Sequence, residues 1–252
     1  MAIVDSVATC YNKMDLIVIV VSDDTTIATT KGGPMANIIT LDLNSPSVQH
    51  LYQKDKRLKK VIHMIGPITY EPHTDNPFPF LIHEIIEQML SVKAGAKIYA
   101  RLESLCKGQV TPYSIDTLSL EDLKSIGTST AKAKYIKNAA SAVLGGTLDF
   151  SQFPTMTDEA ALAQLIQLPG IGMWTAKMYL IFVLDRQNIL PFEDVAFLQS
   201  YKWLYKTTDI SKASIEKKCK KWKPYSSIAA RFLYRALDMG FTKEEFHLYK
   251  KE

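Results

Sequence analysis

Residues 168–172, Leu-Pro-Gly-Ile-Gly, form the segment of this sequence best suited to binding an anion. One residue separates Gly170 from Gly172, so the backbone can approach a ligand without a side chain in the way. A helix is predicted to begin directly afterwards, and its first N–H groups have no partners inside the helix. Such groups bind phosphate well. Because apolar Leu168 and Ile171 anchor the turn, we predict a phosphate-binding hairpin, with an ordinary tight turn between helices as the alternative.

Two neighbouring carboxylates, Glu193 and Asp194, follow the hairpin, and Asp194 lies twenty residues after Trp174. Asp194 precedes a predicted helix, whose N-terminus favours the ionised form of an acid. An ionised carboxylate can stabilise a positive charge that develops during a reaction, or orient a water molecule. The simplest alternative is that Asp194 only caps the helix. On the residues alone, Glu193 stays a second candidate for the catalytic carboxylate.

The segment L-P-G-I-G-M-W-T-A, residues 168–176, resembles the helix-hairpin-helix of DNA glycosylases. The resemblance covers about residues 50–240 and follows the order of the 3-methyladenine DNA glycosylase II branch. It is carried by five ordered segments: Asp55-Lys-Arg-Leu with Gly66-Pro67, Pro79 through Glu87-Gln-Met-Leu-Ser91, Gly127 to Ile136, the hairpin, and Trp222 to Ala229. It implies an α-helical fold in two parts, with DNA across the hairpin and a base pocket between the parts.

The same resemblance assigns the chemistry. A catalytic aspartate of the family begins the helix after the hairpin, which is the position of Asp194. Lyase-type relatives have a Schiff-base lysine where this chain has Trp174, and we assign Lys177, almost a full helical turn further on, to the surface or to a backbone contact. Only Cys219 lies in the C-terminal half, so no four-cysteine iron–sulfur cluster is expected. A monofunctional hydrolase follows.

The resemblance places Trp174, Tyr234 and Met178 in the base pocket. An alkylated purine is positively charged and electron-poor, so aromatic faces select it by stacking and cation–π attraction. Tyr234 stands where the best-known pattern has tryptophan, and Met178 stands where tyrosine is common. Both differences bear on the range of substrates. The alternative for Tyr234 is an ordinary core aromatic in its helix.

DNA contacts and an ion site are also implied by the resemblance. The residues that it assigns to DNA are Gln88, Met89, Ser91, Gly170, Gly172 and Thr175. Met89 takes the place of the apolar wedge that fills the gap left by an extruded base, and an unbranched side chain suits an irregular gap. Packing in the core of its helix is the alternative. Members of the family often hold a monovalent cation on the hairpin carbonyls, here around Leu168 and Ile171, and no other cofactor is expected.

Local patterns predict a small β unit over residues 1–45 and an α-helical body over residues 46–252. The predicted strands are Leu16–Val21, Thr25–Thr30 and Ile38–Leu43. The helices are predicted from the helical spacing of apolar residues and from residues that favour helix ends, including the N-cap residues Ser129 and Thr157. We expect helices near residues 50–66, 80–92, 93–107, 119–126, 130–144, 158–166, 173–184, 194–205, 211–221 and 225–239.

The composition excludes a disordered chain and a membrane protein. Hydrophobic residues make up 47% and charged residues 22%, as in globular proteins, and no apolar run approaches the roughly 20 residues that span a bilayer. Three scattered cysteines and the lack of a secretion signal indicate the cytoplasm. Residues 201–252 carry 13 Lys/Arg against 6 Asp/Glu, which suits a phosphate backbone. The lysines of residues 217–223 are alternatively a solvated helix face.

These features predict a mainly α-helical, monofunctional DNA glycosylase that flips and excises alkylated bases. Its partner is double-stranded DNA with a damaged base, and we expect it to act as a monomer. Two alternatives stay open. A pocket lined by hydrogen-bonding groups would favour a glycosylase for oxidised or deaminated bases. A noncatalytic helix-hairpin-helix protein would bind DNA through the hairpin without cleaving a bond, and the presence of Asp194 argues against this alternative.

Overall fold

The computed structural model describes residues 37–249, in which helices form most of the regular structure. The α-helices are α1 (Pro46–Lys54), α2 (Lys56–Ile65), α3 (Pro77–Glu87), α4 (Val92–Leu105), α5 (Pro112–Thr117), α6 (Leu120–Ser125), α7 (Thr130–Leu144), α8 (Asp158–Leu165), α9 (Met173–Phe182), α10 (Val195–Tyr205), α11 (Lys212–Cys219) and α12 (Ser226–Asp238). Short 3-10 helices are η1 (Phe150–Thr155), η2 (Lys220–Trp222) and η3 (Phe241–Lys243), and the strands are β1 (Ile39–Leu41) and β2 (Ile68–Tyr70). None of these helices is both long enough and apolar enough to cross a membrane.

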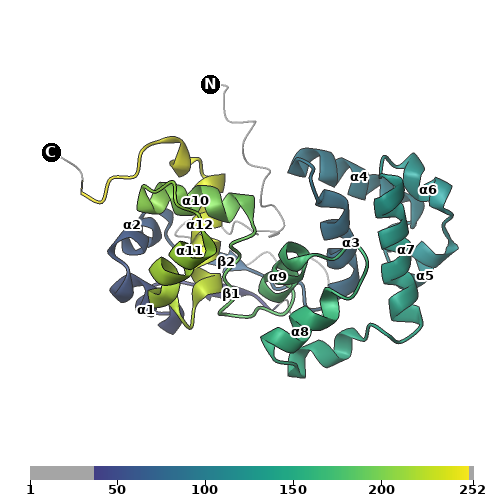
Figure 1. The fold of residues 1–252 in the computed structure, drawn as a ribbon, viewed down its shortest axis with the longest axis horizontal. Helices are drawn as coiled ribbons and strands as arrows, with labels where there is room; N and C mark the ends of the chain where they lie inside the picture. Colours follow the sequence, from purple (N-terminus) through teal and green to yellow (C-terminus); the bar gives the residue numbers. More distant parts are fainter. Residues whose placement is uncertain (1–36, 250–252) are drawn as a thin grey trace, which may run out of the picture.

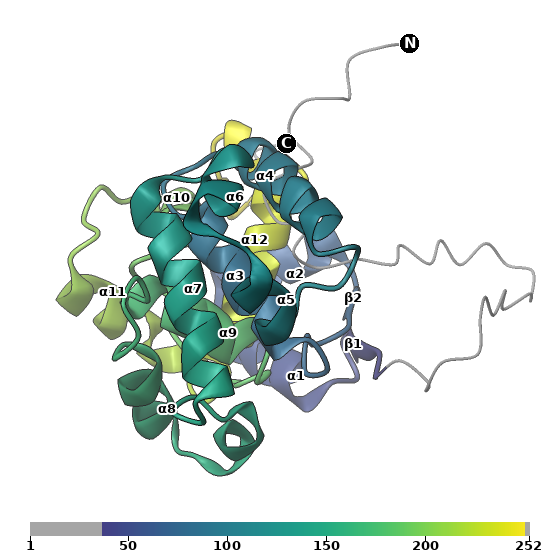
Figure 2. The same cartoon turned by 90° about the vertical axis from the view of Figure 1, so that its right-hand side faces the viewer.

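The helices form two groups with α9 between them (Figure 1). In one group α3 packs on α4 and α7, and α7 packs on α5 and α6. In the other group α12 packs on α2 and α10. Helix α9 contacts both α3 and α8. Figure 2 faces the first group and shows α7 running beside α3 and α5. The predicted mainly α-helical fold is confirmed.

The only sheet in the described part of the chain has two strands. β1 lies inside the predicted run Ile38–Leu43 and pairs antiparallel with β2, with Thr40 opposite Thr69. The sequence analysis did not predict β2, because three residues after Gly66-Pro67 are too few to show a period of two. The other predicted strands, Leu16–Val21 and Thr25–Thr30, lie outside the described residues.

The single helix predicted over residues 50–66 is wrong, since the structure has two helices there with Asp55 between them. Asp55 is extended, at φ −135° and ψ 103°. Its side chain accepts hydrogen bonds from the N–H groups of Arg57 at 3.0 Å and Leu58 at 3.4 Å. Aspartate competes in this way with the helical backbone and favours a cap, so α1 ends and α2 begins at this residue.

The other oxygen of Asp55 joins α2 to the C-terminal helices. It accepts hydrogen bonds from the Tyr205 hydroxyl at 2.5 Å and the Trp222 indole N–H at 2.9 Å, and Lys221 lies 3.1 Å away. Burial raises the pKa of Asp55, but these two hydrogen bonds and the Lys221 charge outweigh burial and lower the pKa below its usual value. Part of the basic cluster at residues 217–223 therefore stabilises the fold.

Two other helices begin at the N-cap residues predicted from the sequence. The hydroxyls of Ser129 and Thr157 accept hydrogen bonds from backbone N–H groups three residues on, at 3.2 Å in each case, so both predicted N-caps are confirmed. Helix α5 was not predicted. It has six residues and begins with a capping box between Thr111 and Ser114, a pattern too short for helical periodicity to reveal.

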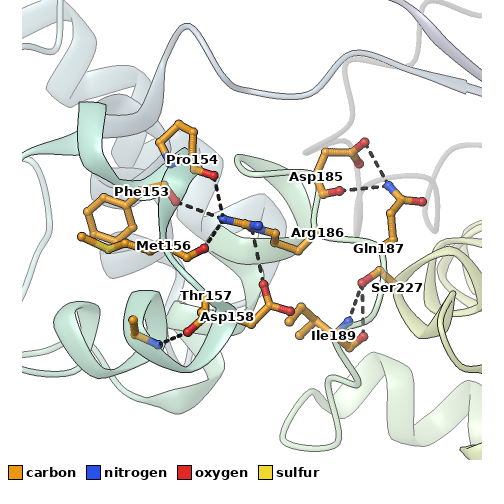
Figure 3. Close-up of polar contacts among 11 residues, drawn as sticks. Phe153, Pro154, Met156, Thr157, Asp158, Asp185, Arg186, Gln187, Ile189 and Ser227 are labelled. Carbon is orange, nitrogen blue, oxygen red and sulfur yellow. Dashed lines mark hydrogen bonds and ion pairs between the residues drawn. The ribbon is translucent and has the colours of Figure 1, made fainter.

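The connector between α9 and α10, residues 183–194, is anchored at several points (Figure 3). The Arg186 guanidinium donates to the carbonyls of Phe153 at 3.0 Å and Met156 at 2.8 Å. The Ile189 N–H donates to the Ser227 hydroxyl of α12 at 2.8 Å. These bonds hold the connector to η1 on one side and to α12 on the other, as Figure 3 shows.

A buried arginine makes a further anchor for the same connector. Arg231 of α12 pairs with Asp185 at 3.0 Å and donates to the Ile181 carbonyl at 2.6 Å. Its guanidinium lies 3.8 Å from the ring centroid of Tyr70, whose hydroxyl donates to Asp185 at 2.9 Å. These contacts hold the beginning of the connector, at Asp185, against β2 and α12.

Candidate active site

The hairpin between α8 and α9 has the conformation that its glycines predict. The Ile171 N–H donates to the Leu168 carbonyl at 3.0 Å, and Gly170 has a φ of +89°. A Cβ atom at Gly170 would lie 2.2 Å from the Tyr135 ring of α7, so glycine is required both by the backbone and by the neighbouring ring. Gly172 is exposed and is the N-cap of α9. The start of α9 is thus open to a phosphate group.

Asp194 is the N-cap of α10, and only 3% of its surface is exposed. One carboxylate oxygen accepts a hydrogen bond from the Phe197 N–H at 2.7 Å. The other accepts a hydrogen bond from the Trp174 indole N–H at 2.6 Å. The carboxylate is therefore held between the first turn of α9 and the first turn of α10.

Tyr234 lies beside this carboxylate on α12 and is 2% exposed. Burial raises the pKa of the Tyr234 hydroxyl well above its usual value, and the negative charge of Asp194 raises it further. Its ring lies 6.2 Å from the ring of Phe182. The phenol therefore stays neutral, and Asp194 has an aromatic side chain from α9 and another from α12 next to it.

Glu193, the alternative carboxylate, is bound elsewhere. Its side chain forms an ion pair with Lys177 at 2.7 Å. Lys177 also donates to the Leu190 carbonyl at 3.1 Å and lies 3.5 Å from the ring centroid of Phe192. Lys177 is 7% exposed, so its assignment to the surface is wrong and its assignment to a backbone contact is confirmed. The burial of this lysine lowers its pKa, an effect that Glu193 opposes.

Met178, the third predicted pocket residue, is 2% exposed on α9. It follows Trp174 by four residues, so the two side chains lie on the same face of the helix. Trp174 itself is only partly buried. The fold thus brings Trp174, Met178 and Tyr234 to the same region as Asp194 through helix spacing and the shared contacts of the carboxylate.

The residues predicted to contact DNA divide into exposed and internal groups. Met89 is 100% exposed, directly after the end of α3, which excludes the alternative that it packs in a helix core. The Gln88 side chain donates to the Gly170 carbonyl at 2.8 Å and to the Thr175 hydroxyl at 3.1 Å. Thr175 is 1% exposed, so its side chain is turned inward, behind the hairpin. The exposed Ser91 caps α4 with its hydroxyl.

The comparison with family models identifies the fold. A model described as the HhH-GPD superfamily base excision DNA repair protein matches residues 82–224, more than half of the chain. The chain belongs to the HhH-GPD superfamily of base excision DNA repair proteins. The matched part of this HhH-GPD protein contains the hairpin, the Met89 turn and Asp194.

Individual relatives are similar to this HhH-GPD protein in sequence, and two of them are solved structures with a similar fold. A crystal structure of a DNA-3-methyladenine glycosidase from Bacillus halodurans is 33% identical, with a TM-score of 0.72, and the match covers 82% of this chain and 95% of that one. The Schizosaccharomyces pombe 3-methyladenine DNA glycosylase Mag1, solved with abasic DNA, is 28% identical, with a TM-score of 0.70, over 76% of this chain and 96% of that one. DNA-3-methyladenine glycosylase 2 of Escherichia coli is 25% identical over 59% of this chain and 53% of its own length.

Sequence reasoning missed a lysine that supports the site of this HhH-GPD protein. Lys132 of α7 donates to the carbonyls of Ile86 and Gln88, at the end of α3. It falls inside one of the segments that carried the family resemblance, but its position near the start of a helix resembles that of any solvated lysine. The signal that reveals its role is the packing of α7 on α3.

The hairpin carbonyls of this HhH-GPD protein fit a weakly held cation. The Leu168 carbonyl accepts one hydrogen bond, from the Ile171 N–H, and a carbonyl oxygen has two lone pairs. Within residues 37–249, no group of three or more His, Cys, Asp and Glu side chains could hold a metal ion.

Proposed function

We propose that this HhH-GPD protein is a monofunctional DNA glycosylase that flips alkylated purines of the 3-methyladenine type out of the duplex and hydrolyses their N-glycosidic bonds. The observation that carries the proposal is the position of Asp194, held between α9 and α10 by Trp174 and the Phe197 N–H. The names of the similar proteins, DNA-3-methyladenine glycosidase and Mag1, support the same class of substrate.

The proposed reaction uses the charge of Asp194. The bond between C1′ and the base nitrogen breaks, and its electron pair leaves with the base. An alkylated purine carries a positive charge before cleavage, so it departs as a neutral molecule. The ionised Asp194 stabilises the cation that develops on the sugar. Water then adds to C1′ and releases a proton, which leaves an abasic sugar.

Aromatic side chains next to the carboxylate supply the selection of the base. The Trp174 indole that donates to Asp194 and the buried Tyr234 provide electron-rich rings from different helices. A cationic purine gains cation–π attraction and stacking from such rings, whereas a neutral purine gains stacking alone. We therefore expect cationic N-alkylpurines to be the preferred substrates.

Lys177 supports the monofunctional assignment. A lysine that forms a Schiff base must reach C1′ of the sugar as a free amine. The Lys177 amine instead contacts the Leu190 carbonyl and the side chain of Glu193, the residue before Asp194. We therefore infer that water is the nucleophile.

We also propose that Met89 is the wedge that replaces the flipped base. Its side chain is fully exposed at a turn tied to the DNA-binding hairpin through Gln88. Met89→Ala should weaken binding to a duplex with an abasic-site analogue, with little change in Tm, because an exposed side chain contributes little to folding. Equal losses of affinity and stability would contradict the wedge role.

The cation proposed at the hairpin carbonyls can be tested by ion replacement. Affinity for the abasic duplex is measured in K⁺ and in tetramethylammonium at equal ionic strength, because the methyl groups of tetramethylammonium keep its charge away from carbonyl oxygens. Weaker binding in tetramethylammonium supports the site, and equal binding contradicts it. Sedimentation of the free protein and of its complex tests the proposed monomer.

The main experiment incubates purified protein with methylated DNA and identifies the released bases by chromatography. Free 3-methyladenine supports the proposal. Release only from oxidised or uracil-containing duplexes indicates the other class of glycosylase, and no release indicates a noncatalytic DNA-binding protein. Asp194→Asn and Glu193→Gln serve as matched variants, since each replaces a carboxylate by its amide at neighbouring positions.

A further inference from the structure

The turn that presents Met89 has an unfavourable backbone conformation. Met89 has a φ of +58°, in the left-handed region that non-glycine residues rarely adopt. Its side chain is fully exposed and therefore gains no packing in the free protein. Contacts of the residues on either side must maintain the conformation.

Lys132 provides the first of these contacts. Its ammonium nitrogen lies 2.7 Å from the Ile86 carbonyl oxygen and 2.5 Å from the Gln88 carbonyl oxygen. The last carbonyls of a helix have no partners inside the helix and carry partial negative charge, so a cation at this end stabilises it. The lysine comes from α7, so it also fixes α7 against the end of α3.

The environment of Lys132 favours this internal role over a contact with solvent. Burial lowers the pKa of Lys132, and the charge of Glu87 acts in the opposite direction. Glu87 is 7% exposed and lies against Gly95, where a Cβ atom would be 2.5 Å from its Cγ. The charge of Glu87 thus favours an ammonium group beside the end of α3.

The Gln88 side chain and the Leu90 N–H hold the rest of the turn. The Gln88 amide donates to the Gly170 carbonyl, and the Leu90 N–H donates to the Glu87 carbonyl at 3.0 Å. Gln88 is thus held by its side chain and by its carbonyl, directly before Met89. These bonds join the turn at residues 88–90, which carries the proposed wedge, to the hairpin before DNA binds.

We propose that Lys132 is a positioning residue, which acts through the carbonyls of Ile86 and Gln88 to hold Met89 in the conformation that enters the duplex. The inference rests on the proposed function of Met89 as a wedge. Ordering the turn before binding lowers the entropy that would otherwise be lost when DNA is bound. Lys132 itself does not need to contact a phosphate group.

The test compares Lys132→Met with Lys134→Met. Lys134 is exposed on the same helix, so its replacement removes an equal charge without removing the contacts to α3. We expect Lys132→Met to lower the affinity for an abasic-analogue duplex about 10-fold, comparable to one contact of about 1.4 kcal/mol. Its affinity for undamaged duplex and its salt dependence should match those of Lys134→Met.

A double-mutant cycle shows whether Lys132 acts through the wedge. In a Met89→Ala background, Lys132→Met should cause little further loss of affinity, because there is no wedge left to position. Additive losses would overturn the proposal. It would also be overturned if Lys132→Met weakened binding to damaged and undamaged duplexes equally, with a shallower salt slope, since that pattern indicates a phosphate contact.

Further readouts keep this test separate from folding and from the reaction. Lys132→Gln retains an uncharged donor nitrogen on a shorter side chain, so its affinity should fall between those of the wild type and Lys132→Met. It replaces Lys132→Met if that variant unfolds. The inference is overturned if both variants bind the abasic-analogue duplex as tightly as the wild type does. Binding to an abasic analogue needs no base release, so a wild-type protein that binds but releases no base would contradict the proposed function alone.

Discussion

Replacement of Asp194 by asparagine separates charge from shape at the site. Asparagine is as good an N-cap as aspartate, but its amide has only one accepting oxygen. In the structure one oxygen of Asp194 accepts from the Phe197 N–H and the other from the Trp174 indole. If the amide oxygen keeps the cap, its NH₂ group faces the Trp174 N–H. The substitution therefore removes the charge and the hydrogen bond from Trp174 together.

The two losses have different expected magnitudes. Removal of one electrostatic stabiliser from a transition state lowers the rate by about 100-fold or more, which is about 2.7 kcal/mol. Loss of one hydrogen bond in the folded state costs about 1 kcal/mol, or about 2–4 °C in the Tm of a protein of this size. Base release by Asp194→Asn should thus fall by at least about 100-fold, with only a small decrease in Tm.

Trp174→Phe is the matched control for the hydrogen bond. It removes the donor to Asp194 but keeps an aromatic ring and the negative charge. Its Tm should decrease about as much as that of Asp194→Asn, while its base release should decrease less. The rates are measured as single-turnover release of methylated base, and abasic-duplex affinity is measured beside them. The reasoning is refuted if Asp194→Asn retains nearly full activity, or if Glu193→Gln abolishes release and Asp194→Asn does not.

Three other outcomes test the hairpin, the Asp55 network and the nucleophile. Gly170→Ala should lower the free energy of unfolding in urea by about 1–3 kcal/mol, because its φ is +89° and its Cβ would meet Tyr135, whereas the same change at Gly172, which faces open space, should cost less. Asp55→Asn should cost about 2–4 kcal/mol at pH 7, since buried donors lose their acceptor. The pKa of Asp55 is lowered in the fold, so the stability that its ionised form contributes should be lost only as the pH falls below about 4, through the folded-state pKa. Urea titrations at several pH values should show this loss of unfolding free energy in the wild type and not in Asp55→Asn. Borohydride should trap no protein–DNA adduct, and a trapped band that disappears in Lys177→Ala would contradict the monofunctional assignment.

Local patterns in the sequence were sufficient for most helices and for the hairpin. Capping residues such as Ser129 and Thr157 act on N–H groups three residues away, so neighbouring residues decide these helix ends. The same holds for Gly170, whose positive φ follows from a tight turn before a helix. The family resemblance then added Asp194, which no local pattern distinguishes from an ordinary N-cap.

Contacts between distant segments decided the rest. Residues 50–66 have helical spacing throughout, but the side chain of Asp55 gains partners from Tyr205 and Trp222 that a helix interior would not offer. β2 forms because β1 lies opposite it, since three residues have too little preference of their own to form a strand.

The assignment of roles in the site also depended on tertiary structure. No local pattern separates Glu193 from Asp194 as the catalytic carboxylate, and their surroundings differ because Glu193 forms an ion pair with Lys177 while Asp194 accepts a hydrogen bond from Trp174. Lys132 resembles a surface lysine until α7 packs on α3. A side chain's chemistry is present in the sequence, whereas its partner is chosen by the packing of segments far apart in the chain, because charge and hydrogen bonding act only over a few ångströms.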